Sequence, residues 1–165
     1  MPFDYEAKLT AVYNSLINAN TLTSGFDLSS GLTTRVKNVF KNDPAVTSIK
    51  SMDYPCVFVR IQNKEEEFGS LGTTGIAGNS KLGTCNYDVI GLYHKDGVIG
   101  LHSTVLNEVY KLAENIEGIF QNNLTLSDTA MWCNPKRTEF FGPFMSGGVF
   151  VKGVLVQLEA RYFFR

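Results

Sequence analysis

"LHSTVLNEVYKLAENIEGIF", residues 101–120, is the stretch that decides the fold of this 165-residue chain. Its apolar side chains recur at steps of three or four residues across about five helical turns. The stripe consists of Leu101, Val105, Val109, Leu112, Ile116 and Ile119, widened by Leu106, Tyr110, Ala113 and Phe120, with Glu108, Lys111, Glu114 and Glu117 on the other side. The pattern predicts a long amphipathic helix, and docking of its apolar face should be the largest single contribution to stability.

One helix and three strands are predicted before this element. Residues 4–17 have the apolar spacing of an amphipathic helix, which Asp4 can cap. A first strand is expected within residues 32–40. The clearest strand of this half is residues 56–63, "CVFVRIQN", which are rich in β-branched and aromatic side chains. Residues 84–94 predict a third strand, half exposed in its first half and buried on both faces in its second.

Two strands are predicted after the long helix. Residues 126–141 indicate a strand interrupted at Asn134 and Pro135, residues 142–148 a turn, and residues 149–165 a final strand. The final strand alternates between two faces. One face carries Val154, Val156, Leu158, Ala160, Tyr162 and Phe164, and the other carries Leu155, Gln157, Glu159, Arg161, Phe163 and Arg165.

This order of elements indicates the fold class. It contains no alternation of strand and helix beyond one unit, which favours an α+β fold over a doubly wound one. We therefore expect a single antiparallel or mixed β-sheet packed by an N-terminal helix and a long central helix. The length fits one domain spanning residues 1–165.

Composition narrows the classes of function. Lys and Arg (15) nearly balance Asp and Glu (16), so the net charge of -1 provides no overall field toward DNA or an anionic membrane. No apolar run approaches the roughly 20 residues of a membrane span. Cys56, Cys85 and Cys133 show no metal-site or disulfide spacing and are expected to be buried, reduced thiols in a protein kept or assembled in the cytoplasm.

No catalytic or cofactor motif is found. The glycine-rich residues 68–84, "FGSLGTTGIAGNSKLGT", do not match the phosphate-loop pattern, because no lysine stands directly after the last glycine of that pattern. In addition, a strand is expected to follow them, rather than the helix that a phosphate site requires. His94 and His102 have no partner at metal-ligand spacing, and no nucleophile-elbow motif is present. We expect no enzymatic activity, no metal and no cofactor.

The same glycine-rich segment is predicted to be a hairpin arm, at about residues 64–83, that is longer than usual hairpin connections. The three acids at its start are read as a solvated, self-repelling loop base or as a contact surface for a basic partner. The expected contact residues are Lys64, Glu65, Glu66, Glu67, Phe68, Gly69, Leu71, Gly72, Gly75, Ile76, Gly78 and Lys81.

Three segments together resemble a known family. They are the opening amphipathic helix, "DPAVTSIKSMDYPCVFVRIQNKEEE" with its "YPCVFV" strand start, and the C-terminal "VKGVLVQLEARYFFR". In this order, with a long helix before the last two strands, the chain resembles the tail terminator, or tail completion, proteins of long-tailed bacteriophages.

The resemblance implies a non-enzymatic virion protein of the tail or neck. Such proteins form a ring, usually of six copies, that caps the head-proximal end of the tail tube, stops its polymerisation and presents a surface to the connector of the head. The expected partners are other copies of the chain, the tube protein and the connector or stopper, with DNA passing only transiently through the lumen and no membrane.

For a protein of tail terminator type, the sequence also predicts which residues make contacts, and it leaves other functions open. Leu155, Phe163 and Arg165 are the expected subunit interface, because they lie opposite the buried face of the last strand. The arm is expected to order on a neighbouring subunit or on the tube. The alternatives are another head-tail connector, such as a stopper or sheath terminator, or a small cytoplasmic enzyme or ligand-binding domain that uses the glycine-rich loop as a lid.

Overall fold

The structure, a computed structural model, describes residues 3–21, 26–42, 49–50, 53–67, 81–94, 102–146 and 149–164. Within these residues the chain forms two helices and one five-stranded sheet. In chain order the elements are α1 (Tyr5–Ala19), β1 (Asn38–Lys41), β2 (Cys56–Glu67), β3 (Lys81–Tyr93), α2 (His102–Asn122), β4 (Trp132–Ser146) and β5 (Val149–Phe164). The expected α+β class is confirmed.

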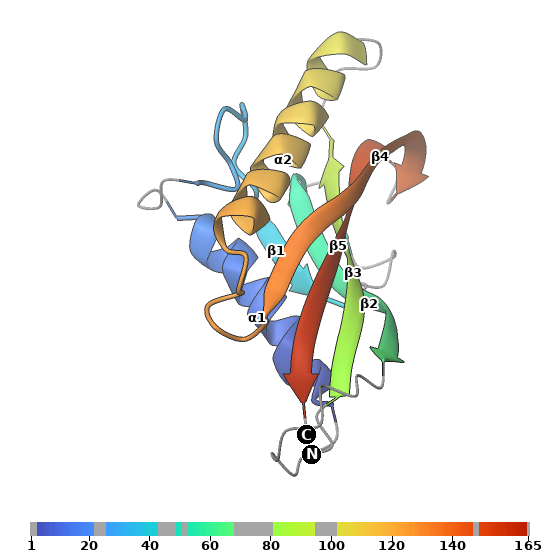
Figure 1. The fold of residues 1–165 in the computed structure, drawn as a ribbon. Helices are drawn as coiled ribbons and strands as arrows, with labels where there is room; N and C mark the ends of the chain where they lie inside the picture. The colour runs from blue at the N-terminus through green and yellow to red at the C-terminus, as the bar shows by residue number, and fades with distance from the viewer. Residues whose placement is uncertain are drawn as a thin grey trace, which may run out of the picture.

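The sheet is mixed, with strand order β1-β2-β3-β5-β4. β1 is parallel to β2, whereas the other three neighbouring pairs are antiparallel. Figure 1 shows α1 and α2 on the same side of this sheet, and their apolar residues share one core cluster with every second residue of β3 and β5. The other side carries neither helix, and we call it the open face.

The start of α1 follows its sequence signal. The Asp4 carboxylate accepts a hydrogen bond from the Ala7 amide at 2.9 Å, which satisfies one of the amide groups that the first helical turn leaves unpaired. The helix continues two residues beyond the expected end. It stops at Ala19, and the Asn20 amide closes the last turn onto Leu16 and Ile17.

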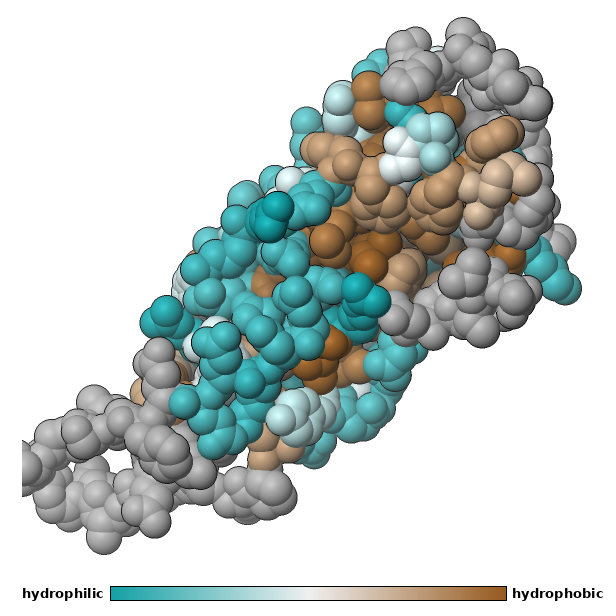
Figure 2. All heavy atoms as spheres, turned by 90° about the vertical axis from the view of Figure 1, so that its right-hand side faces the viewer, coloured by the Kyte–Doolittle hydropathy of each residue, from teal (hydrophilic) through white to brown (hydrophobic). Residues whose placement is uncertain are grey.

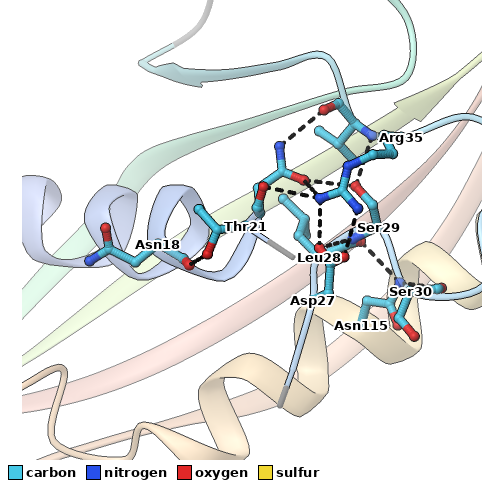
Figure 3. A network of polar contacts seen from close by, with 10 residues as sticks. Asn18, Thr21, Asp27, Leu28, Ser29, Ser30, Arg35 and Asn115 are labelled. Atoms are coloured by element: carbon cyan, nitrogen blue, oxygen red, sulfur yellow. Dashed lines mark hydrogen bonds and ion pairs between the residues drawn. The ribbon is translucent and has the colours of Figure 1, made fainter. Parts of the chain in front are cut away.

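The segment after α1 is held by a polar network, shown in Figure 3. The Arg35 guanidinium donates to the Asp27 carboxylate at 2.8 Å and to the Asn20 carbonyl at 3.1 Å. The Ser29 hydroxyl donates to the Asn20 side chain, and the Val36 amide donates to Ser29. These bonds hold the chain up to Val36, and the strand expected within residues 32–40 is reduced to β1, Asn38–Lys41.

The long helix packs its predicted stripe on the sheet. Val109, Leu112, Ile116 and Phe120 are buried in the core shared with α1, β3 and β5. Gly91 in β3 makes this contact possible, because a Cβ atom there would lie 2.6 Å from the Leu112 Cδ2 atom. The absent side chain forms a notch in the sheet that Leu112 fills.

Glu108 differs from its expected position on the exposed side of the helix. It is buried, and its carboxylate accepts hydrogen bonds from the Thr33 amide at 2.7 Å and the Thr33 hydroxyl at 3.0 Å. Lys111 lies 3.7 Å from the same carboxylate. Glu108 therefore ties the segment before β1 to α2.

Replacing Glu108 by alanine should lower the free energy of unfolding by about 1–3 kcal/mol, because it leaves the Thr33 donors without their partner. Urea unfolding followed by circular dichroism measures the change. Glu114→Ala on the same helix is the control, because Glu114 is exposed and should change stability by less than about 0.5 kcal/mol. Equal losses in the two variants would contradict the role of Glu108.

β4 lies farther along the chain than the strand expected over residues 126–141. It begins at Trp132 and ends at Ser146, and residues 126–131 form turns instead of the first part of the expected strand. β4 crosses both Pro135 and Pro143, and its pairing with β5 shifts register between Pro135 and Arg137 and between Phe141 and Phe144. Proline lacks an amide donor and is tolerated at a sheet edge or a bulge, and β4 is an edge of the described sheet. The expected turn over residues 142–148 is therefore wrong for its first five residues.

Candidate assembly surface

The two faces of the sheet have separate apolar clusters. In β2, Val57 and Val59 belong to the core beneath the helices, whereas Cys56 and Phe58 belong to the second cluster. Successive side chains of a strand point to opposite sides, so the second cluster lies on the open face. The open face is thus not simply a polar surface.

One half of the open face is apolar. Its buried members are Ile49, Tyr54, Cys56, Ile90, Leu92 and Val151, and the half-buried side chains around them are Phe40, Phe58, Phe141, Phe144, Val149 and Leu155. We call this set the apolar half. Figure 2 shows hydrophobic side chains gathered on one part of the face and hydrophilic ones on the rest. Half-buried aromatic rings of this kind are typical of protein-protein contact surfaces.

Phe141 is positioned in the apolar half by a second glycine. Its ring lies over Gly153 of β5, where any Cβ atom would overlap it, and a Cβ atom would also lie 3.0 Å from Leu92. The ring stacks on Phe144 with centroids 5.9 Å apart. The two phenylalanines thus form one flat aromatic group next to the edge of the sheet.

The other half of the open face is a network of charges that crosses the strands. The Arg60 Nε of β2 lies 3.1 Å from the Asp88 carboxylate of β3, whose side chain is only 3% exposed. Gln157 of β5 donates to the same carboxylate at 3.4 Å. Further along β5, Glu159 pairs with Lys136 of β4 at 2.9 Å. We call this set the polar half, and in it opposite charges largely neutralise each other.

The acidic base of the predicted arm is part of the sheet. Residues 64–67 belong to β2 and pair with residues 82–85 of β3, so the expectation of a loop base is wrong, although Glu65 and Glu66 are exposed as expected. Lys64 allows this. Its side chain is only 7% exposed, it pairs with Glu66, and its ammonium lies 4.4 Å from the centre of the Phe3 ring and 5.6 Å from that of Tyr5.

Some of the predicted arm residues therefore lie in β2 and β3, and the others lie outside the described residues. Lys64, Glu65, Glu66 and Glu67 end β2, and Lys81 begins β3 opposite Phe164. Phe68, Gly69, Leu71, Gly72, Gly75, Ile76 and Gly78 lie outside the described residues. Of the predicted arm at about residues 64–83, residues 68–80 lie outside the described part of the chain.

The predicted subunit-interface residues lie on one face but at different places. Leu155 belongs to the apolar half, where it is half-buried. Phe163 is 51% exposed on the same face of β5. Eight residues separate them, which is about 26 Å along a strand, and the polar half lies between. Arg165 lies outside the described residues.

Two exposed apolar pairs were not predicted. Tyr110 of α2 and Phe140 of β4 meet edge to face with ring centroids 4.8 Å apart, on the helix side of the sheet. Met145 and Phe150 are cross-strand partners near the end of the β4–β5 hairpin, and both are more than half exposed. The two prolines in residues 132–146 conceal the alternation of β4, so its outward residues carry no clear signal in the sequence.

Comparison with known proteins gives no further assignment. No protein family model matches this chain, and no curated protein matches its sequence.

The titratable groups with shifted pKa values lie mainly in the interior. The three cysteines are buried free thiols, as predicted, and burial raises the pKa of Cys56 and of Cys133 to about 12. The hydroxyls of Tyr87 and Tyr162 share a hydrogen bond of 2.7 Å, and burial raises the pKa of both. These groups are protonated at neutral pH, and thiols in that state are poor nucleophiles.

The two histidines remain as candidates for chemistry. His94 contacts the Phe150 carbonyl at 2.8 Å, and His102 is the first residue of α2. Among the described residues, no three His, Cys, Asp or Glu side chains are grouped so that they could hold a metal ion. No helix in the described part of the chain is long and apolar enough to cross a membrane.

Proposed function

We propose that this protein is a structural virion component of tail terminator type. Copies of the chain form a ring, of six in the family it resembles, on the head-proximal end of the tail tube. The ring stops polymerisation of the tube and offers its other surface to the connector of the head. The protein acts in the tail or neck of the virion without catalysis or cofactor.

The observation that supports this proposal best is the open face. It combines an apolar half with half-buried Phe40, Phe58, Phe141 and Phe144 and a polar half whose charges are paired across four strands. A cap on a tube needs a broad surface that excludes water in one part and fixes orientation in another. A sheet face that neither helix covers offers both.

The three segments that carry the family resemblance are also joined in the fold. α1 packs on β1 and β2, and β3 pairs with β2 on one side and with β5 on the other. The pairing of charges in the polar half is compatible with a ring through which DNA passes, since a strongly basic surface would hold phosphates.

Electron microscopy of particles assembled without this protein tests the function. A terminator is required to stop the tube, so its loss should give overlong tails or tails without heads. Restoring the protein from a plasmid should return tails of uniform length attached to heads. Normal, head-attached tails in its absence would contradict the proposal, and normal tail length with failed head attachment would favour a stopper instead.

The rival enzyme or ligand-binding function predicted a concave pocket with a titratable residue of shifted pKa. The pocket that lies between α1 and α2 is lined by Asn, Ser, Thr, Ala and other uncharged residues. None of the groups with a shifted pKa in the described residues lines it. No observation therefore favours acid-base chemistry at this pocket.

Phe163→Ser should prevent ring formation and leave the monomer folded, because the exposed ring contributes little to the stability of the subunit. Size-exclusion chromatography with light scattering, in the presence and absence of purified tail tubes, measures assembly. Phe140→Ser is the matched control, since Phe140 is also an exposed aromatic residue but lies on the helix side. Rings formed by Phe163→Ser, or lost equally in both variants, would contradict the placement of the interface.

Deleting residues 69–79 should abolish capping while the monomer stays folded. This deletion leaves the pairing of β2 with β3 intact, whereas the wider deletion of residues 69–83 would remove Leu82 and Gly83, the partners of Glu67 and Glu66. Thermal unfolding monitors the fold, and tail length in complemented particles monitors capping. Tails of normal length would show that the arm is not required.

A further inference from the structure

A pocket of about 420 Å³ lies between the two helices, at the C-terminal end of each. Its floor is apolar and includes Ala11, Ala19 and Ile119. Its rim includes the amide side chains of Asn14 and Asn18. None of the described residues that line it carries a charge. The volume falls within the range of pockets that hold small molecules.

The far wall of the pocket is a loop that Asn123 holds in place. The Asn123 side chain donates to the Ser15 hydroxyl at 3.1 Å and accepts from the Ser127 amide at 2.9 Å. Leu126, Ser127 and Asp128 have φ values of 49°, 55° and 67°, a conformation that is unfavourable for residues with side chains. The turn buries Leu126 in the core and leaves Ser127 at the pocket wall.

The rim of the pocket offers amide groups that the fold does not use. Within the described residues, the side chains of Asn14 and Asn18 are exposed and make no hydrogen bond. Figure 3 shows Asn18 near the end of α1, where only its backbone carbonyl is engaged, by the Thr21 hydroxyl at 2.8 Å. Asn122 donates to the Gly118 carbonyl and retains its side-chain oxygen as an acceptor.

We propose that this pocket binds a neutral sugar of hexopyranose size. A pyranose has an apolar C–H face and a rim of hydroxyls that both donate and accept hydrogen bonds. The aliphatic floor and the ring of Phe26, which is 50% exposed, match the C–H face. The amides of Asn14 and Asn18 both donate and accept, and therefore match the hydroxyls.

Because the described lining residues carry no charge, the pocket favours a neutral ligand. A phosphate or carboxylate ligand would lose its hydration at this site without gaining a cationic partner. A purely apolar ligand would cover the Asn14 and Asn18 amides without hydrogen bonds. The site does not depend on ring assembly, because it lies on the helix side of the sheet, opposite the open face.

Amide chemical-shift titration of the whole chain tests the site. The probes are D-glucose, D-galactose and N-acetyl-D-glucosamine, with glucose 6-phosphate as the charged comparison. At least one neutral sugar should bind with a dissociation constant on the order of millimolar, given the few contacts available. The shifts should centre on Asn18, Ser127 and Thr129. Weaker binding of glucose 6-phosphate than of glucose is also expected.

Variants separate this site from general surface effects. Asn18→Leu should weaken binding by about tenfold or more, because a sugar hydroxyl would lose its partner. Asn107→Leu, an exposed position of the same type on α2 outside the pocket, should leave binding unchanged. Asn14→Leu serves as a second pocket variant if Asn18→Leu fails to fold. The proposal is overturned if no neutral sugar shifts these amides up to about 50 mM, if both pocket variants bind normally, or if glucose 6-phosphate binds as well as glucose.

Discussion

Raising the pH from about 8.5 to about 11 should unfold the protein, because its buried thiols and phenols cannot ionise in the folded state. Burial raises the pKa of Cys56 and Cys133 to about 12, and it also raises the pKa of Cys85, Tyr87 and Tyr162. In the unfolded chain these thiols ionise near pH 8.5 and the phenols near pH 10.

The sign of the effect follows from the direction of the shifts. An acid whose pKa is raised by folding stays protonated in the native state, so the stability is fully present below its unfolded pKa. It is lost as the pH rises from there toward the folded pKa. Each buried thiol removes about 1.4 kcal/mol per pH unit in this range.

Urea unfolding at a series of pH values, followed by far-ultraviolet circular dichroism, measures this loss. The double variant Cys56→Ala and Cys133→Ala should show a shallower fall, by about 2.7 kcal/mol per pH unit for the two thiols. Asn107→Ala is a surface comparison, because Asn107 is exposed and does not ionise, and it should leave the slope unchanged. A stability that stays constant between about pH 8.5 and 11 would contradict the burial of these groups.

Leu112→Ala should lower the free energy of unfolding by about 2–5 kcal/mol, because it empties the contact between α2 and the notch at Gly91. Gly91→Ala should cost about 1–3 kcal/mol, since the new methyl group would lie 2.6 Å from the Leu112 Cδ2 atom. In the double variant the smaller side chain at position 112 leaves room for the methyl group. Its loss should therefore be smaller than the sum of the single losses.

A double-mutant cycle from urea unfolding gives this coupling, with an expected magnitude of about 0.5–3 kcal/mol. Gly118→Ala is the matched control. Gly118 lies within α2, and a Cβ atom there would meet only the Phe26 ring at an ordinary distance of 3.6 Å. That variant should be neutral or stabilise by up to about 1 kcal/mol. Strict additivity of Gly91→Ala and Leu112→Ala would show that the two residues do not share the contact.

The elements predicted best are those whose pattern is local. The stripe of α2 and the alternation of β5 extend over many residues, so their buried faces could be identified from the sequence. The burial of Glu108 could not, because it depends on Thr33, which lies far away in the chain. The bounds of β4 also escaped prediction, since the edge position that tolerates Pro135 and Pro143 is a property of the whole sheet.

The candidate surface was predicted only in part for the same reason. The exposure of Phe163 follows from alternation in one strand. The apolar half depends on five separate segments that meet only in the folded sheet, and nothing local in "CVFVRIQN" shows that Cys56 and Phe58 face away from both helices. The contacts of Lys64 with Glu66 and with the rings of Phe3 and Tyr5 likewise overturn the expectation of an acidic loop, and they too form only in the folded chain.

Two of the glycines in the sheet, Gly91 and Gly153, also have a mechanical consequence. Gly91 of β3 pairs with Val154 of β5, and Gly153 of β5 pairs with Leu92 of β3, so the two glycines are diagonal neighbours. Leu112 presses into the sheet from one side at the first, and Phe141 from the other side at the second. Neither glycine has a side chain between the strand backbone and the residue packed on it, and close-packed interiors transmit displacement. A load on Phe141 from a bound partner should therefore reach α2, so that the two layers respond to contact as one body.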